Sequence, residues 1–363
     1  MRQTDFKKPP IVRLPPRSNF DIVLSRAVQV SIIVMGLVAG IFALQAGKLV
    51  LAPVSLAVVV GLMLGPVANR LEDRGLPSWA SSAIVILLFI TAICGLAAAL
   101  IGPLSFWAGE LPRIWEELRE QMAELREPLQ LLQGLQEQIR NVTGDSGVTV
   151  AVQEGSPIES VAMLAPALLA QILLFIASLY FFVATRDGIR AAVLRVCVDR
   201  RLRWRTAHIF RDVETLVSTY LLSITAINIG LGLMVTLALW VAGVPSAPLW
   251  GALAGLLNFI VYIGPAIMTV ILFVVGLGTY DTFSGIMMPL AIYLSINLVE
   301  AQFVTPVVVG RTLTLNPFVV LLALSFWIWL WGAVGGFVAI PAVLVVIAIA
   351  RNILPGLGNG MEE

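Results

Sequence analysis

Charged side chains are scarce in this sequence. They make up 12% of the chain, while 59% of the residues are hydrophobic and the mean hydropathy is +0.94. A soluble globular chain averages about 25% charged and about 45–50% apolar residues, because its surface must interact with water. The composition therefore excludes a soluble globular protein and predicts an integral membrane protein. The formal net charge of +1 gives no indication of a nucleic-acid partner.

Histidine and cysteine are nearly absent as well, which removes most catalytic and metal-binding chemistry. The one histidine, His208, lies in a basic stretch away from any nucleophile, so neither a Ser-His dyad nor a His-based zinc site is expected. No GxxxxGKS or GxxxxGKT phosphate-binding loop occurs, and only Asp281 comes close to membrane depth, so neither ATP hydrolysis nor paired-aspartate proteolysis is indicated. Cys94 lies in a hydrophobic run and Cys197 in the basic stretch, so no disulfide is expected. We predict a protein that is not an enzyme and that uses no cofactor or metal.

Long apolar runs account for most of the chain. A helix that crosses the roughly 30 Å core of a bilayer needs about 20 apolar residues, and about eight segments reach this length. They are 27–46, 49–68, 80–103, 160–184, 215–242, 248–277, 285–305 and 317–350. The sixth and eighth exceed one straight crossing and carry glycine and proline, so each is a tilted crossing, a broken helix or a hairpin that re-enters on one side. The predicted fold is an all-α polytopic transmembrane helix bundle with broken or re-entrant helices in its C-terminal half.

The distribution of arginine and lysine predicts the orientation. The N-terminal tail, the loop at 69–79 and the arginine-rich loop at 185–213 are basic, whereas 104–159 is mainly acidic. Because basic loops stay in the cytoplasm, the N-terminus is expected inside and 104–159 outside. Three hydrophobic segments separate the N-terminal tail from 104–159 and a fourth leads back to 185–213, which agrees with this orientation. The chain start lacks a small-residue cleavage site and is interpreted as a cytoplasmic tail. We expect a multi-pass protein of a bacterial inner membrane.

These patterns divide the chain into consecutive parts. They are a cytoplasmic basic tail (1–26), three transmembrane segments (27–103), an extracytoplasmic amphipathic helical region (104–159), a fourth transmembrane segment (160–184), a cytoplasmic arginine-rich loop (185–213), a transmembrane core with broken segments (214–350) and a C-terminal tail (351–363). Charges beyond residue 242 are too few to orient the last segments, and Arg311 would lie outside if all of them were single crossings.

The external region carries a heptad pattern. Leucine or isoleucine recurs every seven residues from Leu111 to Ile139, and Trp115 and two further apolar residues occupy the alternate positions. Such a pattern over about four repeats is typical of a coiled-coil seam. A proline and a glycine interrupt it, so a kinked helix is expected over 108–140. The helix either folds back on its own chain or pairs with a second copy, and homo-oligomerisation is favoured because no second stripe of similar length lies nearby.

Glu300 is the most distinctive polar residue in the hydrophobic segments. It lies in the sequence NLVEAQFVTP, between Asn297 and Pro306, with Gln302 two positions later. A carboxylate inside a membrane is unfavourable unless it faces a partner or a water-filled path, and one that binds a proton or cation suits ion-coupled transport. Asn297 precedes it by three residues and shares its helix face. The alternatives are a glutamate near the membrane surface, or one that pairs structurally with Arg311.

A second set of polar residues is expected within the membrane, in the fifth and sixth segments. Asn258 precedes the sequence FIVYIGP, in which Tyr262 is followed by Gly264 and Pro265, and Asn228 is a further amide in the fifth segment. Glycine and proline should break the helix here and free backbone amides and carbonyls. Transporters use such unwound backbone near mid-membrane to hold substrates and ions. The alternative is a plain proline kink between packed helices.

Two short sequences repeat each other within the C-terminal half. They are WGALAG at 250–255 and WGAVGG at 331–336, each with a proline before and after it. Paired segments interrupted by glycine and proline point to a transport site. The match is also of the common GxxxG type, for which close helix packing is the alternative explanation.

Three stretches resemble the autoinducer-2 exporter family, a group of bacterial permease-like membrane proteins. They are PLWGALAGLLNFIVYIGP at 248–265, the segment from Asn297 to Arg311, and LNP at 315–317 followed by the glycine run at 332–336 and AIP at 339–341. The order of hydrophobic and basic segments over roughly 25–350 is also similar. One departure is Val261, where the family usually has proline. The resemblance implies transport of small solutes, above all export of autoinducer-2, and some relatives resemble sodium or lithium/proton antiporters.

Three hypotheses follow for the function. The first is a secondary transporter that exports a small solute, such as autoinducer-2 or a similar signalling molecule or metabolite, with proton or sodium coupling through Glu300. The second is a Na⁺(Li⁺)/H⁺ antiporter centred on Glu300, and the third is a non-transporting membrane scaffold. The residues expected along the transport path are Glu300, Asn297, Asn258, Tyr262, Gly264, Pro265, Gln302, Pro306, Arg311 and Asn228. The expected partners are the solute, a coupling ion, the lipid bilayer and further copies of the chain, with no nucleic acid.

Overall fold

The computed structural model describes residues 19–140, 157–309 and 316–353 of the chain. Within these ranges the backbone is helical apart from short turns and contains no strand, which confirms the predicted all-α fold. Residues 141–156 of the predicted external region lie outside the described residues, as does Arg311.

The helices follow the predicted hydrophobic segments in order. They are α1 (Asn19–Ala46), α2 (Lys48–Glu72), α3 (Ser78–Arg140), α4 (Pro157–Val196), α5 (Arg200–Val241), α6 (Ala247–Leu257), α7 (Ile263–Leu277), α8 (Phe283–Val299), η1 (Glu300–Val304), α9 (Thr305–Val309), α10 (Pro317–Trp331) and α11 (Ala333–Ile353). In the described part of the chain, 7 helical stretches are long and apolar enough to cross a bilayer. Each predicted segment contributes one of them except the sixth, whose two helices are shorter.

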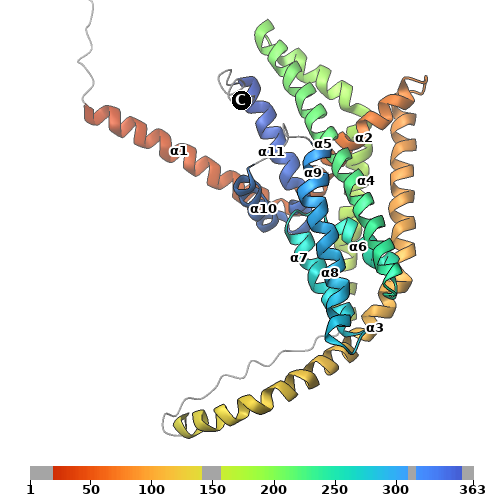
Figure 1. The fold of residues 1–363 in the computed structure, drawn as a ribbon. Helices are drawn as coiled ribbons and strands as arrows, with labels where there is room; N and C mark the ends of the chain where they lie inside the picture. The colour runs from red at the N-terminus through yellow and green to blue at the C-terminus, as the bar shows by residue number, and fades with distance from the viewer. Residues whose placement is uncertain (1–18, 141–156, 310–315, 354–363) are drawn as a thin grey trace, which may run out of the picture. The chain divides into compact units, whose positions relative to one another are not determined.

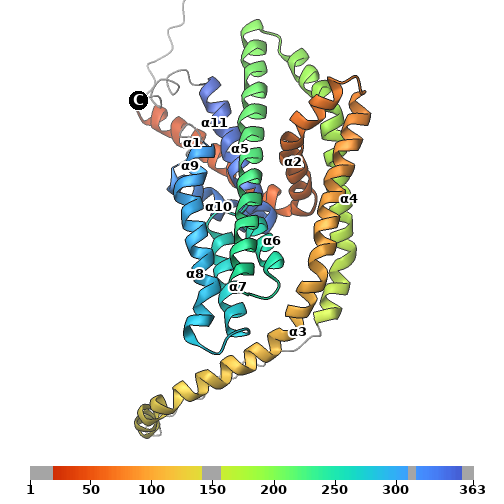
Figure 2. The same cartoon turned by 45° about the vertical axis from the view of Figure 1, so that its right-hand side comes forward.

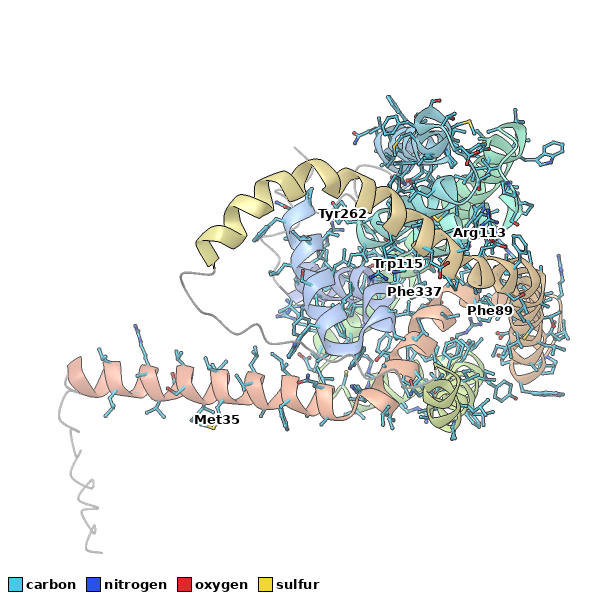
Figure 3. All side chains as sticks on the ribbon, turned by 90° about the horizontal axis from the view of Figure 1, so that it is seen from below. Met35, Phe89, Arg113, Trp115, Tyr262 and Phe337 are labelled. Carbon is cyan, nitrogen blue, oxygen red and sulfur yellow. The ribbon has the colours of Figure 1, made fainter. Side chains whose placement is uncertain are left out.

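Helix α1 belongs to a compact unit of its own, residues 1–48. None of its side chains from Val23 onward is buried, and Met35, labelled in Figure 3, is 70% exposed. Apolar residues cover its whole circumference, which is the pattern expected of a helix that lipid surrounds. The remaining helices belong to the second unit, residues 49–363.

The predicted sixth segment is two helices, α6 and α7, joined by a sharp break at 258–262. A Cβ atom added to Gly264 would collide with the carbonyl oxygen of Leu257, so the helices can turn this closely only because residue 264 is glycine. Pro265 fits the first turn of α7, where no backbone donor is needed. The two helices have 11 and 15 residues. At 1.5 Å per residue they rise by about 16 and 22 Å, which is less than the thickness of the hydrocarbon core.

The predicted eighth segment is also broken. Helices α10 and α11 are separated only by Gly332, whose φ of +64° lies in the region that favours glycine. Gly335, in the first turn of α11, lies so close to the carbonyl oxygen of Trp327 that no Cβ atom could be accommodated. The repeated sequences are therefore not structurally equivalent, because 250–255 lies within α6 whereas 331–336 contains a break.

The two broken segments approach each other along α5. The α6–α7 pair lies beside the second half of α5 and the α10–α11 pair beside its first half (Figures 1 and 2). In that first half, the Asn352 side-chain amide of α11 donates a hydrogen bond of 2.7 Å to Asp212. Where the pairs meet, the rings of Phe259 and Phe337 lie 5.5 Å apart between centroids. The two breaks are thus brought together near the middle of α5.

Two regions differ in structure from the sequence-based expectation. The arginine-rich stretch 185–213 is not an irregular loop, because α4 and α5 extend through it and leave only 197–199 outside helix. Arginine and alanine favour helix, and the charge pattern that predicted a loop reports only polarity. The external region is likewise continuous with the third hydrophobic segment in α3, a helix of 63 residues that bends along its length (Figure 1).

The middle of α3 packs against the α6–α7 pair. Trp107 meets Trp250 of α6 edge to face, with 5.1 Å between ring centroids, and Ile114 is buried in the same cluster. By contrast, the heptad positions Leu111 and Trp115 are 52% and 67% exposed. Leu111 follows Trp107 by four residues and precedes Ile114 by three, so it borders the packed face of α3 and is still exposed.

Candidate functional site

Glu300 lies where the helix of the seventh segment changes its hydrogen-bond pattern. Helix α8 continues into the π-helical turn η1, in which the N–H of Thr305 donates to the carbonyl of Glu300, five residues earlier. Pro306 explains the widened turn, because it has no N–H and its ring would collide with the carbonyl of Gln302 in a regular α-helix. Single π-turns of this kind are frequent at functional sites.

The Glu300 side chain is buried in an apolar environment. Glu300 is 9% exposed, and its Oε1 atom accepts a hydrogen bond from the Thr305 hydroxyl. Tyr293, two turns earlier on α8, is fully buried, and its hydroxyl has no hydrogen-bond partner among the described residues. A carboxylate in such surroundings is costly unless a proton or a cation neutralises it. Glu300 is therefore a buried carboxylate whose recorded side-chain partner is a single hydroxyl group.

A cavity of about 550 Å³ lies against Glu300, between α5 and the α8–η1–α9 helix. On the α5 side it is lined by residues that include Ile227, Gly230 and Met234, and on the other side by Val299, Glu300 and apolar neighbours. Cavities of about 300–1,000 Å³ accommodate small organic molecules. Because Met234 and Val299 are more than half exposed, the cavity opens onto the surface between these helices.

Asn228 and Asn258 form a second polar contact, on a different face of α5. The Asn258 side-chain amide donates a hydrogen bond of 2.8 Å to the Oδ1 atom of Asn228. Asn228 is 2% exposed, and its own Nδ2 atom has no partner among the described residues. The site thus holds an amide donor that a bound polar group could satisfy.

Close packing of α5 on α6 brings these two asparagines together. A Cβ atom added to Gly255 would lie 2.7 Å from the carbonyl oxygen of Asn228, and one added to Gly232 would lie 2.9 Å from that of Gly251. Both distances are too short for any side chain, so the helices meet backbone to backbone. The glycines of the sequence WGALAG therefore position Asn258 against α5.

The break between α6 and α7 holds a strained residue. Tyr262 has φ +64° and ψ −49°, and the N–H of Ile263 donates to the carbonyl of Val261 at 2.8 Å. This is a γ-turn of the rare positive-φ kind, which is unfavourable for a residue with a side chain. The Tyr262 side chain, labelled in Figure 3, is 51% exposed. Strain of this kind persists where the surrounding structure imposes it, and it is frequent at ligand sites and switches.

The structure brings some of the predicted path residues together and separates others. Pro306 lies beside the π-turn that holds Glu300, and Asn228 contacts Asn258 next to the break that contains Tyr262, Gly264 and Pro265. By contrast, Gln302 is exposed and Asn297 is partly buried, and neither lines the cavity. The path residues therefore form two groups, one at the cavity and one at the helix break.

Several residues of this arrangement were not predicted from the sequence. Thr305 could have been found as the hydroxyl next to the proline of the π-turn. Tyr293 could have been found because it precedes Glu300 by seven residues, which places both on one helix face. The α5 wall, with Gly230 and Met234, carries no polar residue, so nothing in the sequence distinguishes it from a lipid-facing surface.

A separate charged cluster links α2, α3 and α4. Arg186 of α4 donates hydrogen bonds to the carbonyl of Gly65 at 2.9 Å and to the side chain of Asn69, and it pairs with Glu72 at 3.3 Å. The Ser81 hydroxyl of α3 donates to the same Glu72 carboxylate at 2.9 Å. The arginine is thus satisfied by neighbouring helices, which indicates a structural role.

Apolar spanning helices, two helix breaks that meet beside α5 and a buried carboxylate at a cavity together define the architecture of a membrane transporter. The sequence profile described as AI-2E family transporter matches residues 30–354. The chain belongs to this family, which confirms the resemblance found in the sequence.

Individual relatives agree with this membership. The chain is 28% identical to the AI-2 transport protein TqsA of Escherichia coli (strain K12), over 82% of this chain and 84% of that protein. It is 25% identical to YhhT of the same organism over 91% of this chain, and 26% identical to MT0215 of Mycobacterium tuberculosis over 86%. The names of the last two describe transport proteins without a substrate. The protein is therefore a multi-pass membrane transporter, and membership favours transport over catalysis and over the scaffold hypothesis.

Proposed function

We propose that the protein is a secondary transporter that exports a small solute, such as autoinducer-2 or a similar signalling molecule or metabolite, with proton or sodium coupling through Glu300. The observation that carries this proposal is the position of Glu300, which is buried in a π-turn on the wall of a cavity of about 550 Å³. Similarity to TqsA, which is named as an AI-2 transport protein, supports the solute class.

In this proposal Glu300 alternates between two forms. When it is protonated, the carboxyl is neutral and is compatible with its apolar surroundings. When it is ionised, it needs a cation nearby, and the Thr305 hydroxyl donates to it. Exchange between the two forms couples ion movement to occupancy of the adjacent cavity. The broken segments that meet beside α5 supply helix ends and unwound backbone of the kind that transporters use to bind substrates and ions.

Na⁺(Li⁺)/H⁺ antiport is the second candidate. It is favoured by two adjacent oxygen ligands, the Glu300 carboxylate and the Thr305 hydroxyl. Hard monovalent cations bind to oxygen ligands of these kinds. If antiport is the main activity, addition of sodium or lithium alone should release protons, and a strain that lacks the protein should grow poorly at high salt.

We further propose that the protein lies in the bacterial inner membrane with its N-terminus and the Arg186–Arg211 stretch in the cytoplasm. Cys197 provides a test of the orientation, because it lies at the turn between α4 and α5. With Cys94 replaced by alanine, a membrane-impermeant thiol reagent should label Cys197 in inverted vesicles and not in intact spheroplasts. The reverse result would show the opposite orientation.

The transport proposal is tested with inverted membrane vesicles from cells that overproduce the chain. The vesicles are incubated with a cell extract under an imposed proton or sodium gradient, and their contents are analysed by untargeted mass spectrometry. We expect at least one solute to accumulate only when the protein is present and only while the gradient is maintained. If no solute accumulates and neither sodium nor lithium moves protons, both candidate functions are excluded.

A further inference from the structure

The cavity beside Glu300 combines one carboxylate with walls that are almost wholly apolar. Its described lining contains two polar side chains, Glu300 and Ser295, and the Ser295 hydroxyl already donates to the carbonyl of Ala291 at 2.7 Å. Asn228 and Asn258 contribute nothing to the lining, because they lie on another face of α5. The cavity therefore offers one negative charge and few other polar contacts.

This composition restricts what the cavity can bind. A neutral polyhydroxylated solute would lose its hydrogen bonds to water and regain few of them. An anion would be repelled by Glu300. A bare metal ion would need several oxygen ligands, and the described side chains supply few: the Glu300 carboxylate, the Ser295 hydroxyl and, beside Glu300, the Thr305 hydroxyl. A monovalent cation that carries its own apolar body avoids all three difficulties.

The size and opening of the cavity agree with such a ligand. About 550 Å³ is far more than an inorganic ion requires and is within the range for a small organic molecule. The helices that form it are apolar enough to span a bilayer, and Met234 and Val299 expose it at the surface between them. An amphipathic cation that partitions into the membrane could therefore enter from the side.

The turn that holds Glu300 forms part of the cavity wall. Glu300, Val304 and Val308 follow one another at intervals of four residues and all line the same cavity. The carboxylate is thus placed at one wall, while valines extend the apolar surface on either side of the turn.

We propose that this cavity binds a monovalent organic cation whose charge pairs with Glu300 and whose apolar body fills the space between α5 and the α8–η1–α9 helix. The inference rests on the proposed transport site. It assigns amphipathic cations as the substrate class and departs from polyhydroxylated or anionic solutes such as signalling molecules of those kinds.

Tetraphenylphosphonium and tetraphenylborate provide a matched pair of probes, because they have nearly the same size and shape and opposite charges. Binding of each is measured by equilibrium dialysis with the full chain in lipid nanodiscs. We expect the phosphonium ion to bind the intact chain and Asp281→Asn equally, because Asp281 is exposed in the turn before α8, away from the cavity. Glu300→Gln should bind it about tenfold more weakly or worse, since a charge-assisted contact is lost. The borate ion should show no binding that depends on Glu300.

Gly230→Leu tests the cavity without altering the carboxylate. A Cβ atom added to Gly230 meets nothing within 4 Å, and Gly230 lines the cavity, so a leucine there should extend into the empty space. We expect this variant to keep its fold and to lose phosphonium binding. Equal binding by the intact chain, Glu300→Gln and Gly230→Leu would overturn the inference, as would binding of the borate ion, above that of empty nanodiscs, that Gly230→Leu abolishes.

These outcomes are separate from those of the transport experiment. If solute accumulation requires Glu300 while phosphonium binding does not, the amphipathic-cation inference fails and the proposed function stands. If phosphonium binding requires Glu300 while no solute or ion moves, the binding site stands and the proposed function fails.

Discussion

At the scale of single residues, the backbone of Tyr262 holds a conformation that its own side chain disfavours. Its φ of +64° suits glycine, and half of its side chain is exposed, so the contacts of the ring offset little of the strain. The neighbouring glycine and proline and the packing of α6 on α5 hold the turn in place. Strain of this kind is frequent at ligand sites and switch regions.

Substitution of Tyr262 should therefore separate strain from side-chain contacts. Tyr262→Gly and Tyr262→Ala both remove the ring, and only glycine relieves the positive φ. We expect the glycine variant to be more stable than the alanine variant by about 1 kcal/mol, as measured by thermal unfolding in detergent. Equal stability of the two variants would show that residue 262 is not strained in the folded protein.

The planar guanidinium of Arg186 donates hydrogen bonds to several acceptors at once, in a geometry that the ammonium group of lysine cannot reproduce. The guanidinium reaches a backbone carbonyl, an amide and a carboxylate of α2. Arg186→Lys should therefore lower the free energy of unfolding by about 1–2 kcal/mol although the charge is retained. Arg195→Lys, at an exposed position on the same helix, is the control and should have no measurable effect. If both variants are equally stable, the cluster does not hold α2 against α4.

At the scale of helices, the contact between α5 and α6 determines where Asn258 lies. A methyl group on Gly255 would overlap the carbonyl of Asn228, which is backbone and cannot move aside. We expect Gly255→Ala to lower the free energy of unfolding by about 1–3 kcal/mol and to disrupt the asparagine pair. Gly95→Ala, on an open face of α3, should instead be neutral or stabilising by up to about 1 kcal/mol. The same thermal assay compares them, and equal effects would mean that the helices are not packed this closely.

Much of the helix order could be predicted from the sequence, because segment length in a membrane is fixed by bilayer thickness. The breaks at Gly264–Pro265 and near Gly332 were also predictable, since these residues change the backbone chemistry. The helical structure of 185–213 was not, because charge reports polarity and not conformation. The π-turn at Glu300 was not predicted, although Pro306, six residues later, is a local signal for a disturbed helix. The facing α5 wall depends on tertiary packing and has no local sequence pattern.

At the scale of the whole molecule, the heptad seam of α3 is the feature that indicates contact with a second copy of the chain. Ile114 faces the chain's own α6–α7 pair, while Leu111 and Trp115 remain exposed. Exposed apolar residues at heptad positions are available for contact with a second copy of the chain, which is the self-association that the sequence predicts.

Self-association can be tested with charges in the seam. Leu118→Glu combined with Leu125→Glu should reduce the detergent-solubilised protein to a single chain, as measured by light scattering on a sizing column. Glu120→Gln combined with Glu127→Gln, on the opposite side of the heptad, should leave the size unchanged. An unchanged size for the leucine variant would contradict association through this seam.

The central claim is that Glu300 carries the coupling ion, and one measurement tests it most directly. Inverted vesicles establish a proton gradient, which a fluorescent dye reports, and sodium or the solute identified by the vesicle assay is then added. The account predicts that the intact chain and Asp281→Asn dissipate the gradient, and that Glu300→Gln behaves like vesicles without the protein although it is present in equal amount. Dissipation by Glu300→Gln at the rate of the intact chain would contradict the account.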